Sequence, residues 1–341
     1  MTTSTTPSLA KRITAAAAIF ALVACSDFTP TARQVAPGVL AVDTAPGATI
    51  EVLDWGGAGT PIVFLAGGGH TAHQFDNFAP LLTDSFRVVG ITRRGVGGSS
   101  EARHRFNRDR IRDIARVLEA LDLESAVLIG HSQGGLEAAE FAQAYPQRCR
   151  GIVHLDSALL GGREELAEIF RSTPPPSPPE RTESDNASIA AVQAWTEDTQ
   201  GFRLSESELR AVNELDGTGR VLGPAPRDTG PRYGWPGQVP ELRWEAVECP
   251  ALGLYPVTAP LETWLPFYRD RFDTTTPEER SQADAYYRAF SSWTAERRAE
   301  FGGFPQNRVV EYPGSGHYFF LNERWQADTL EDIRDFLAEL E

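Results

Sequence analysis

The chain has 341 residues, of which 41% are hydrophobic and 23% charged, a composition sufficient for one large globular domain with insertions. Acidic residues outnumber basic ones, 47 against 32, so nucleic acid is not expected as a partner. Lys11 is the single lysine. If the segment that contains it is removed, Ser-Lys dyads, Schiff bases and lysine-dependent phosphate loops are excluded.

The first 24 residues have the pattern of an export signal. Lys11 and Arg12 supply a positive start, and residues 13–24 form an apolar run that is too short to span a bilayer comfortably. The small residues before Cys25 resemble the lipobox of bacterial lipoproteins. This resemblance implies lipidation of Cys25 and a membrane-anchored protein at the outer membrane or facing the periplasm, with residues 25–38 as a tether. A cleaved secretory signal that releases a soluble protein is the alternative.

Short apolar runs follow, typical of the buried strands of a mostly parallel sheet. Helix-like segments alternate with them, notably 107–121, where apolar residues recur on one face behind Asn107. The alternation predicts a doubly wound α/β fold over residues 39–156 and again over 249–341. The expected strands are 39–42, 49–55, 61–66, 86–92, 126–129, 151–155, 251–255 and 308–312, with a last helix at 326–340.

Two insertions interrupt this pattern. Residues 157–248 contain a proline-rich stretch and weak helical segments, and their number predicts a cap or lid in place of a plain loop. Residues 261–304 form a second, helical insertion that is rich in aromatic side chains. Most of these are expected to pack between helices, and a minority to line an apolar substrate pocket.

Cys149 and Cys249 each precede a predicted strand, 151–155 and 251–255 respectively. If these strands are neighbours in a parallel sheet, both sulfurs lie at the same end of it. The sequence then allows either a disulfide or two buried thiols, depending on the stagger of the strands.

Gly130-His131-Ser132-Gln133-Gly134 lies between the apolar run 126–129 and a segment with apolar residues at helical spacing, 136–145. A G-x-S-x-G sequence between a strand and a helix is typical of a nucleophile elbow, where a sharp turn exposes the serine hydroxyl. Ser132 is therefore the candidate nucleophile. The backbone amide of Gln133, the next residue, is expected to donate to the oxyanion.

A serine nucleophile needs a base to take its proton, and the base needs a carboxylate to orient it. His317, in a glycine-rich segment after the last predicted strand, is the candidate base. His131 belongs to the elbow and is expected to point away from the serine hydroxyl, and His154 lies within a strand. His70-x-x-His73 lacks an evident third ligand, so no metal is expected. No cofactor is expected either, because the serine mechanism does not require one.

The elbow, the late Gly-x-Gly-His segment and the turn Thr92-Arg-Arg-Gly-Val-Gly-Gly-Ser-Ser100 together resemble the α/β-hydrolase superfamily, in its esterase-like branch, over nearly all of the chain after the signal. The resemblance implies an acid after the strand that follows the elbow helix, which is Asp156. Glu262, after the next strand, is the alternative. The resemblance also implies a second oxyanion donor in the turn 66–70, with the amide of Gly68 favoured.

These residues predict a hydrolase that cleaves carboxylic esters of small molecules through an acyl-enzyme. Serine-dependent cleavage of amides, lactones or carbon–carbon bonds, and perhydrolysis, use the same elbow and stay open as alternatives. A non-catalytic binding lipoprotein is a further alternative. Haloalkane dehalogenases and epoxide hydrolases need a carboxylate where Ser132 stands, which argues against both.

Overall fold

The computed structural model describes residues 28–101, 107–157, 163–175, 179–226, 243–257 and 276–340. The export signal, Cys25 and Glu262 lie outside these residues. In the described part of the chain, no helix is long and apolar enough to cross a membrane.

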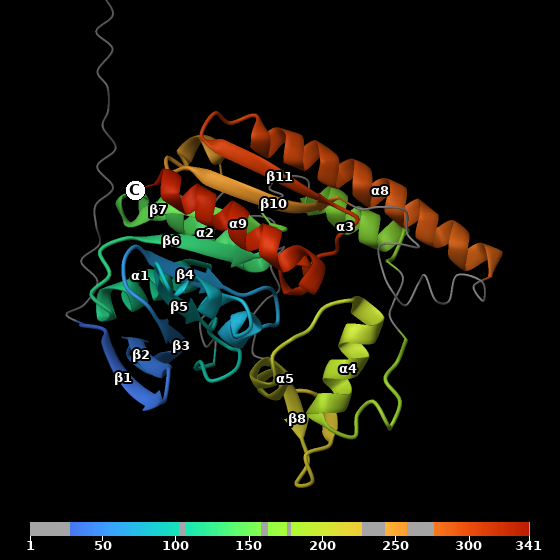
Figure 1. Ribbon diagram of the computed structural model, residues 1–341, viewed down its shortest axis with the longest axis horizontal. Helices are drawn as coiled ribbons and strands as arrows, with labels where there is room; N and C mark the ends of the chain where they lie inside the picture. The colour runs from blue at the N-terminus through green and yellow to red at the C-terminus, as the bar shows by residue number, and fades with distance from the viewer. Residues whose placement is uncertain are drawn as a thin grey trace, which may run out of the picture.

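A nine-stranded sheet in the order β1-β2-β3-β5-β4-β6-β7-β10-β11 forms the centre of the molecule (Figure 1). The strands from β5 to β11 in this order are parallel, and β3, β2 and β1 extend one edge as antiparallel strands. The predicted doubly wound α/β fold is confirmed. The strands are β1 Thr31–Ala36, β2 Val39–Ala45, β3 Ala48–Gly56, β4 Pro61–Leu65, β5 Arg87–Ile91, β6 Ala126–His131, β7 Cys149–Leu155, β10 Ala251–Val257 and β11 Asn307–Pro313.

Helices cover both faces of the sheet. Two hydrophobic clusters result, because alternate residues of each buried strand point to opposite faces. Helix α9 and the short 3₁₀ turns η1 and η2 pack on one face, while α1, α2 and the end of α8 pack on the other. These elements are α1 Asn107–Ala120, α2 Gln133–Ala144, α8 Pro277–Gly302, α9 Glu323–Glu339, η1 Ala72–Phe75 and η2 Ala79–Leu82.

Part of the predicted tether 25–38 is a strand. Thr31–Ala36 forms β1, which pairs antiparallel with β2, and all six of its residues are exposed. The prediction of a tether was wrong here because backbone hydrogen bonds to the edge of β2 hold the segment in the sheet. A strand without a buried face carries no alternating apolar pattern that would reveal it.

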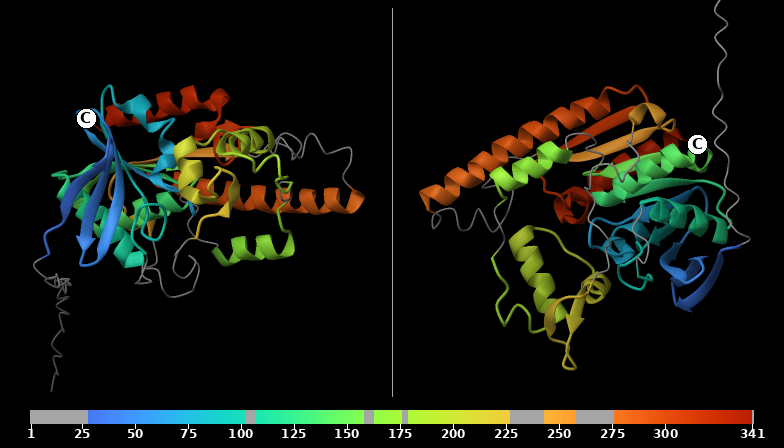
Figure 2. Two further views of the ribbon diagram at one scale, coloured as in Figure 1. Left: turned by 90° about the horizontal axis from the view of Figure 1, so that it is seen from below. Right: turned by 180° about the vertical axis from the view of Figure 1, so that it is seen from behind.

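In its described residues, the interval 157–248, predicted to form a cap, contains three helices, a hairpin and a short turn. Figure 2 shows α3 alongside α8, and α4, α5 and the hairpin together outside the sheet. Ile189 and Val192 of α4 and Leu209 of α5 belong to the same apolar cluster as α9. The hairpin was not predicted, because its strands are too short to show a period. The elements are α3 Arg163–Ser172, α4 Ile189–Gln200, α5 Glu206–Val212, β8 Asn213–Leu215, β9 Val221–Pro224 and η4 Trp244–Ala246.

Cys149 and Cys249 lie at the same end of β7 and β10, which are neighbouring parallel strands as expected. Their sulfur atoms are 3.5 Å apart and both residues are free thiols, as in the second predicted alternative, except that Cys149 is buried and Cys249 only partly so. The hydrogen bond with the Cys249 thiol, together with burial, raises the pKa of Cys149.

Candidate active site

The carboxyl ends of β4, β6 and β7 lie side by side. Leu65 pairs with Gly130, and His131 pairs with Leu155. In doubly wound sheets ligands bind at the carboxyl ends of the strands, where the strand order reverses, and β4 stands at such a point between β5 and β6. The segments that leave these three strands contain the predicted site residues Gly68, Ser132, Gln133 and Asp156.

Ser132 forms the sharp turn between β6 and α2. Its backbone angles are φ 50° and ψ −116°, in a region that residues other than glycine rarely adopt. The turn also packs closely against β4, because a Cβ atom at Gly134 would lie 2.1 Å from the carbonyl oxygen of Leu65. This strained turn has the geometry of a nucleophile elbow.

His317 and Asp156 are in direct contact, with 2.5 Å between His317 Nδ1 and Asp156 Oδ2. His317 follows β11, and its side chain is 42% exposed, whereas that of Asp156 is 15% exposed. Asp156 itself has a positive φ of 45°, and its amide donates to the carbonyl of Leu254. A carboxylate at Nδ1 favours the proton there, which leaves Nε2 of His317 as the atom able to accept a proton.

His131 supports the loop that carries His317. The two imidazole rings pack 4.4 Å apart, and His131 Nε2 donates to the backbone carbonyl of His317 at 3.1 Å. Its Nδ1 accepts from Gln74 Nε2 at 3.0 Å. Burial, and after it the charges of His317 and His70, lower the pKa of His131 well below its usual value. His131 is therefore neutral, with both ring nitrogens occupied.

The glycine-rich turn 66–70 lies directly against the elbow. A side chain at Gly67 would reach within 3.6 Å of Ser132 Cβ, and one at Gly68 within 3.0 Å of Gln133 Oε1. The Gly67 amide donates to Gln74 Oε1 at 3.0 Å. Among the described residues, no acceptor binds the amide of Gly68, the second predicted oxyanion donor.

Arg93, which was not predicted as a site residue, holds the opposite side of this turn. Its guanidinium donates to the carbonyl of Ala66 at 2.8 Å and to that of Gly67 at 3.2 Å. In a trans peptide the C=O and N–H groups point in opposite directions. The contact with the Gly67 carbonyl therefore turns the Gly68 amide away from Arg93 and fixes its orientation.

A bidentate ion pair keeps Arg93 in place. Arg93 Nε and a terminal nitrogen lie 2.6 and 2.9 Å from the two carboxylate oxygens of Glu137, on the helix that follows Ser132. Both side chains are almost fully buried. The adjacent Arg94 forms a similar buried pair with Asp113. In the sequence, two arginines directly after a buried strand indicate that buried carboxylates pair with them, but do not show which acidic residues these are.

The two histidines of His70-x-x-His73 contact different carboxylates. His70 Nδ1 lies 2.7 Å from Glu208 Oε1, and His73 Nδ1 lies 2.8 Å from Asp76 Oδ2. Burial acts to lower the pKa of His73, but the hydrogen bond and charge of Asp76 raise it overall. No group of three or more potential metal ligands was found in the part of the chain that the structure describes.

Comparison with known proteins identifies relatives of the central part of the chain. A family model described as the alpha/beta hydrolase fold matches residues 60–240. A non-heme chloroperoxidase of Streptomyces lividans is 40% identical over 111 residues, which are 31% of this chain and 40% of that protein. A bifunctional esterase/perhydrolase of Acinetobacter calcoaceticus is 35% identical over 108 residues, 31% of this chain and 39% of the relative. The similarity thus spans less than half of each of these relatives.

Solved structures resemble the chain over most of its length. E-2-(acetamidomethylene)succinate hydrolase superposes with a TM-score of 0.58 over 91% of this chain and 99% of that one, at 19% identity. An alpha/beta hydrolase of Novosphingobium aromaticivorans superposes with a TM-score of 0.56 over 89% and 98%, at 18% identity. At such low identity the likeness concerns the fold.

Proposed function

The chain belongs to the alpha/beta hydrolase family, and on that premise we propose that it is a serine hydrolase that cleaves carboxylic esters through an acyl-enzyme. The observation that carries the proposal is the contact of His317 Nδ1 with Asp156 Oδ2 at 2.5 Å, at the same edge of the sheet as the strained turn of Ser132. A nucleophile, a base and an orienting carboxylate are the groups that acyl transfer requires.

In the first half of the proposed reaction, His317 Nε2 takes the proton of Ser132 Oγ as this oxygen attacks the ester carbonyl carbon. The bond from that carbon to the leaving alkoxide then breaks, and His317 returns the proton to the alcohol. Asp156 keeps the imidazole oriented and balances its positive charge. A water molecule next attacks the acyl-serine with His317 as base, which releases the acid and restores Ser132.

The amides of Gly68 and Gln133 stabilise the negative charge on the carbonyl oxygen of the tetrahedral intermediate. Two features support this role: the turn of Gly68 lies against Gln133, and Arg93 fixes the orientation of the Gly68 peptide. Backbone donors that are already oriented before the reaction stabilise an oxyanion strongly, because they need no reorganisation when the charge develops.

Perhydrolysis is the second candidate function, favoured by the names of the two relatives, a bifunctional esterase/perhydrolase and a non-heme chloroperoxidase. The same acyl-enzyme forms on Ser132. Hydrogen peroxide then replaces water as the second nucleophile, so that the product is a peracid in place of the acid. The two functions differ only in which nucleophile the site admits to the acyl-enzyme.

The N-terminal pattern supports a further part of this proposal, namely that the chain is exported and lipidated at Cys25. The enzyme would then meet its substrate at a membrane surface outside the cytoplasm. Metabolic labelling with a radioactive fatty acid tests this: we expect label in the wild-type protein and none in Cys25→Ser, whereas an unlabelled wild-type protein contradicts the anchor.

Fluorophosphonate labelling followed by intact-mass measurement and peptide mapping tests the catalytic proposal. We expect one adduct, on Ser132, which is absent in Ser132→Ala and retained in Ser172→Ala, a change of an exposed serine on α3. Turnover of p-nitrophenyl esters should fall by about 10⁶-fold in Ser132→Ala. A folded wild-type protein that takes no adduct and cleaves no ester overturns the proposal. Peracid formation with added hydrogen peroxide distinguishes the second candidate.

A further inference from the structure

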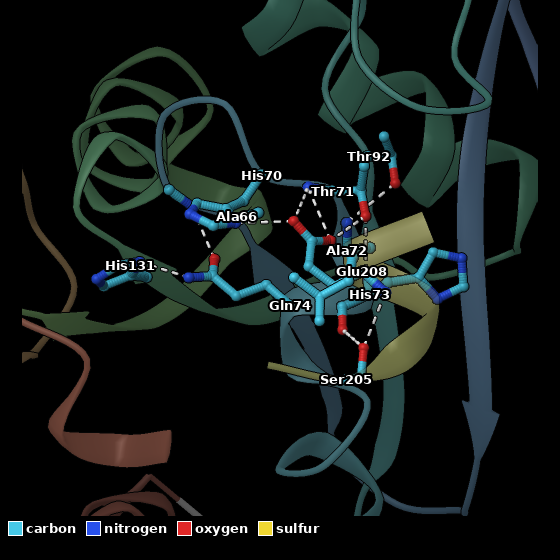
Figure 3. A network of polar contacts seen from close by, with 12 residues as sticks. Ala66, His70, Thr71, Ala72, His73, Gln74, Thr92, His131, Ser205 and Glu208 are labelled. Atoms are coloured by element: carbon cyan, nitrogen blue, oxygen red, sulfur yellow. Dashed lines mark hydrogen bonds and ion pairs between the residues drawn. The ribbon is translucent and has the colours of Figure 1, made fainter. Parts of the chain in front are cut away.

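Glu208, on the cap helix α5, is fully buried against the loop that follows β4 (Figure 3). Its carboxylate accepts a short hydrogen bond from the Thr71 hydroxyl and longer ones, at 3.3 Å, from the Thr71 amide. His70 Nδ1 lies 2.7 Å from the same carboxylate. Burying a carboxylate is unfavourable unless several donors compensate for the lost water, and these three groups supply them.

A second contact, made by Ser205, connects α5 to the same loop. Ser205 is the N-cap of α5, and its hydroxyl oxygen accepts from the amide of Glu208 at 3.0 Å. The same hydroxyl donates to the backbone carbonyl of His73 at 2.8 Å. Residues 70–73 are thus held by the cap through side chains and backbone, immediately after the turn that carries the Gly68 amide.

Hydrogen bonds also connect residues 70–73 to the loop that carries His317, the predicted base. His70 Nε2 lies 3.0 Å from the hydroxyl of Tyr318, the residue after His317. The ring of Tyr318 stacks at 4.0 Å on Phe202, which also belongs to the cap interval. Glu208, His70 and Tyr318 therefore form a chain of hydrogen bonds from the cap to the segment that carries His317.

We propose that Glu208 is a positioning residue of the active site, through which the cap orients both the oxyanion turn and the His317 loop. The inference rests on the proposed function, since it assigns Glu208 a part in the same reaction. Glu208 touches neither the substrate nor the reacting atoms. It acts on the turn of Gly68 through His70 and Thr71, and on the His317 loop through His70 and Tyr318.

The direction of the hydrogen bonds distinguishes positioning from simple packing. A carboxylate at Nδ1 favours the His70 tautomer that has its proton there, in which Nε2 accepts from the Tyr318 hydroxyl. In Glu208→Gln the new amide group retains the volume and an acceptor for Thr71, but it can donate its N–H to His70 Nδ1. His70 then carries its proton on Nε2 and donates to the Tyr318 hydroxyl. The direction of this hydrogen bond is reversed, whereas the packing around residue 208 is unchanged.

The test compares Glu208→Ala and Glu208→Gln with Glu206→Gln, a matched change of an exposed carboxylate two residues earlier on α5. Active sites are titrated with fluorophosphonate, so that kcat is expressed per competent molecule. For Glu208→Ala we expect kcat to fall about 100-fold, within the range for a lost oxyanion donor, with KM changed less than about threefold. For Glu208→Gln we expect a loss of about tenfold with an unchanged melting temperature.

A boronic acid inhibitor, which mimics the tetrahedral intermediate, supplies the second readout. Its affinity should fall in parallel with kcat in both Glu208 variants and stay unchanged in Glu206→Gln. If the wild-type enzyme is active and Glu208→Gln has the same kcat and the same inhibitor affinity, the role of Glu208 is refuted while the proposed function stands. A wild-type protein that neither reacts with fluorophosphonate nor cleaves esters overturns the proposed function, and this failure appears equally in Glu206→Gln.

Discussion

Replacing Arg93 by methionine removes the group that orients the turn 66–70, which carries the proposed oxyanion donor Gly68. Arg93 is 7% exposed, and its guanidinium makes two hydrogen bonds to Glu137 and two to the carbonyls of Ala66 and Gly67. Methionine fills a similar volume but donates to none of these acceptors. The change therefore breaks a buried ion pair and releases the peptide that carries the Gly68 amide.

Two effects of different size follow from these contacts. Loss of one partner of a buried ion pair costs about 3–5 kcal/mol of the free energy of unfolding, because the other charge remains buried. Loss of one oxyanion donor costs about 10²–10³ in kcat, or about 3–4 kcal/mol of transition-state stabilisation. Since Arg93→Met frees the Gly68 peptide without removing its amide, we expect a decrease in kcat of about 30–100-fold.

Arg94→Met is the matched control. Arg94 is the next residue, is 8% exposed and forms a bidentate pair with Asp113, but no hydrogen bond connects its guanidinium to the glycine-rich turn among the described residues. Urea denaturation should show a similar loss of stability in both variants. Ester hydrolysis, measured well below the melting temperature and per fluorophosphonate-reactive molecule, should fall only in Arg93→Met.

Equal kcat values in the two variants would refute the reasoning, because the fall in activity would then follow from instability. The double variant Arg93→Met/Glu137→Leu sharpens the test. It also removes the buried Glu137 carboxylate, which has lost its bidentate partner, and should regain about 2 kcal/mol of stability. Its kcat should stay low, since the carbonyls of Ala66 and Gly67 remain without their donor.

Two further predictions concern Asp156 and His154. Asp156→Asn should lower kcat about 10⁴-fold at neutral pH because the amide favours the wrong tautomer of His317; if Glu262→Gln shows this loss instead, Glu262 is the acid. His154 has no hydrogen-bond partner on either ring nitrogen among the described residues, and burial lowers its pKa from 6.5 to about 3. Because the unfolded chain then binds the extra proton, native stability falls as pH falls from 6.5 towards 3, by about 1.4 kcal/mol per pH unit. His154→Leu should remove this loss of stability, which is about 3 kcal/mol at pH 4. If the free energies of unfolding of variant and wild type, from urea denaturation, change with pH in the same way, the prediction is contradicted.

The core of the fold is predictable from the amino-acid sequence because the signals for its strands and helices are local. Apolar runs of strand length, a helical period behind Asn107 and the spacing of the elbow each depend on residues close together in the chain. These patterns indicated the strands from β2 to β7, the strands β10 and β11, and the elbow at Ser132. They did not indicate β1 or the hairpin of β8 and β9, where the strands are exposed or too short to show alternation.

His317 was predicted from its place after the last strand and Asp156 from the family resemblance, but their contact joins residues that are 161 positions apart. Arg93 and Gln74 gave no comparable signal. Their importance comes from which backbone groups lie opposite them once the strand ends meet, and that depends on the packing of β4 against β6. Residues that are far apart in the chain and form a hydrogen bond produce no local sequence pattern from which the partners could be predicted.

Glu206 and Glu208 show this limit within one helix. They are the same residue type, two positions apart, in a short segment of the cap interval. Glu206 is exposed and pairs with Arg210 on the same helix, whereas Glu208 is fully buried and binds His70 and Thr71. Which carboxylate meets the loop after β4 depends on tertiary packing, because the direction in which α5 packs determines which of its faces is removed from water.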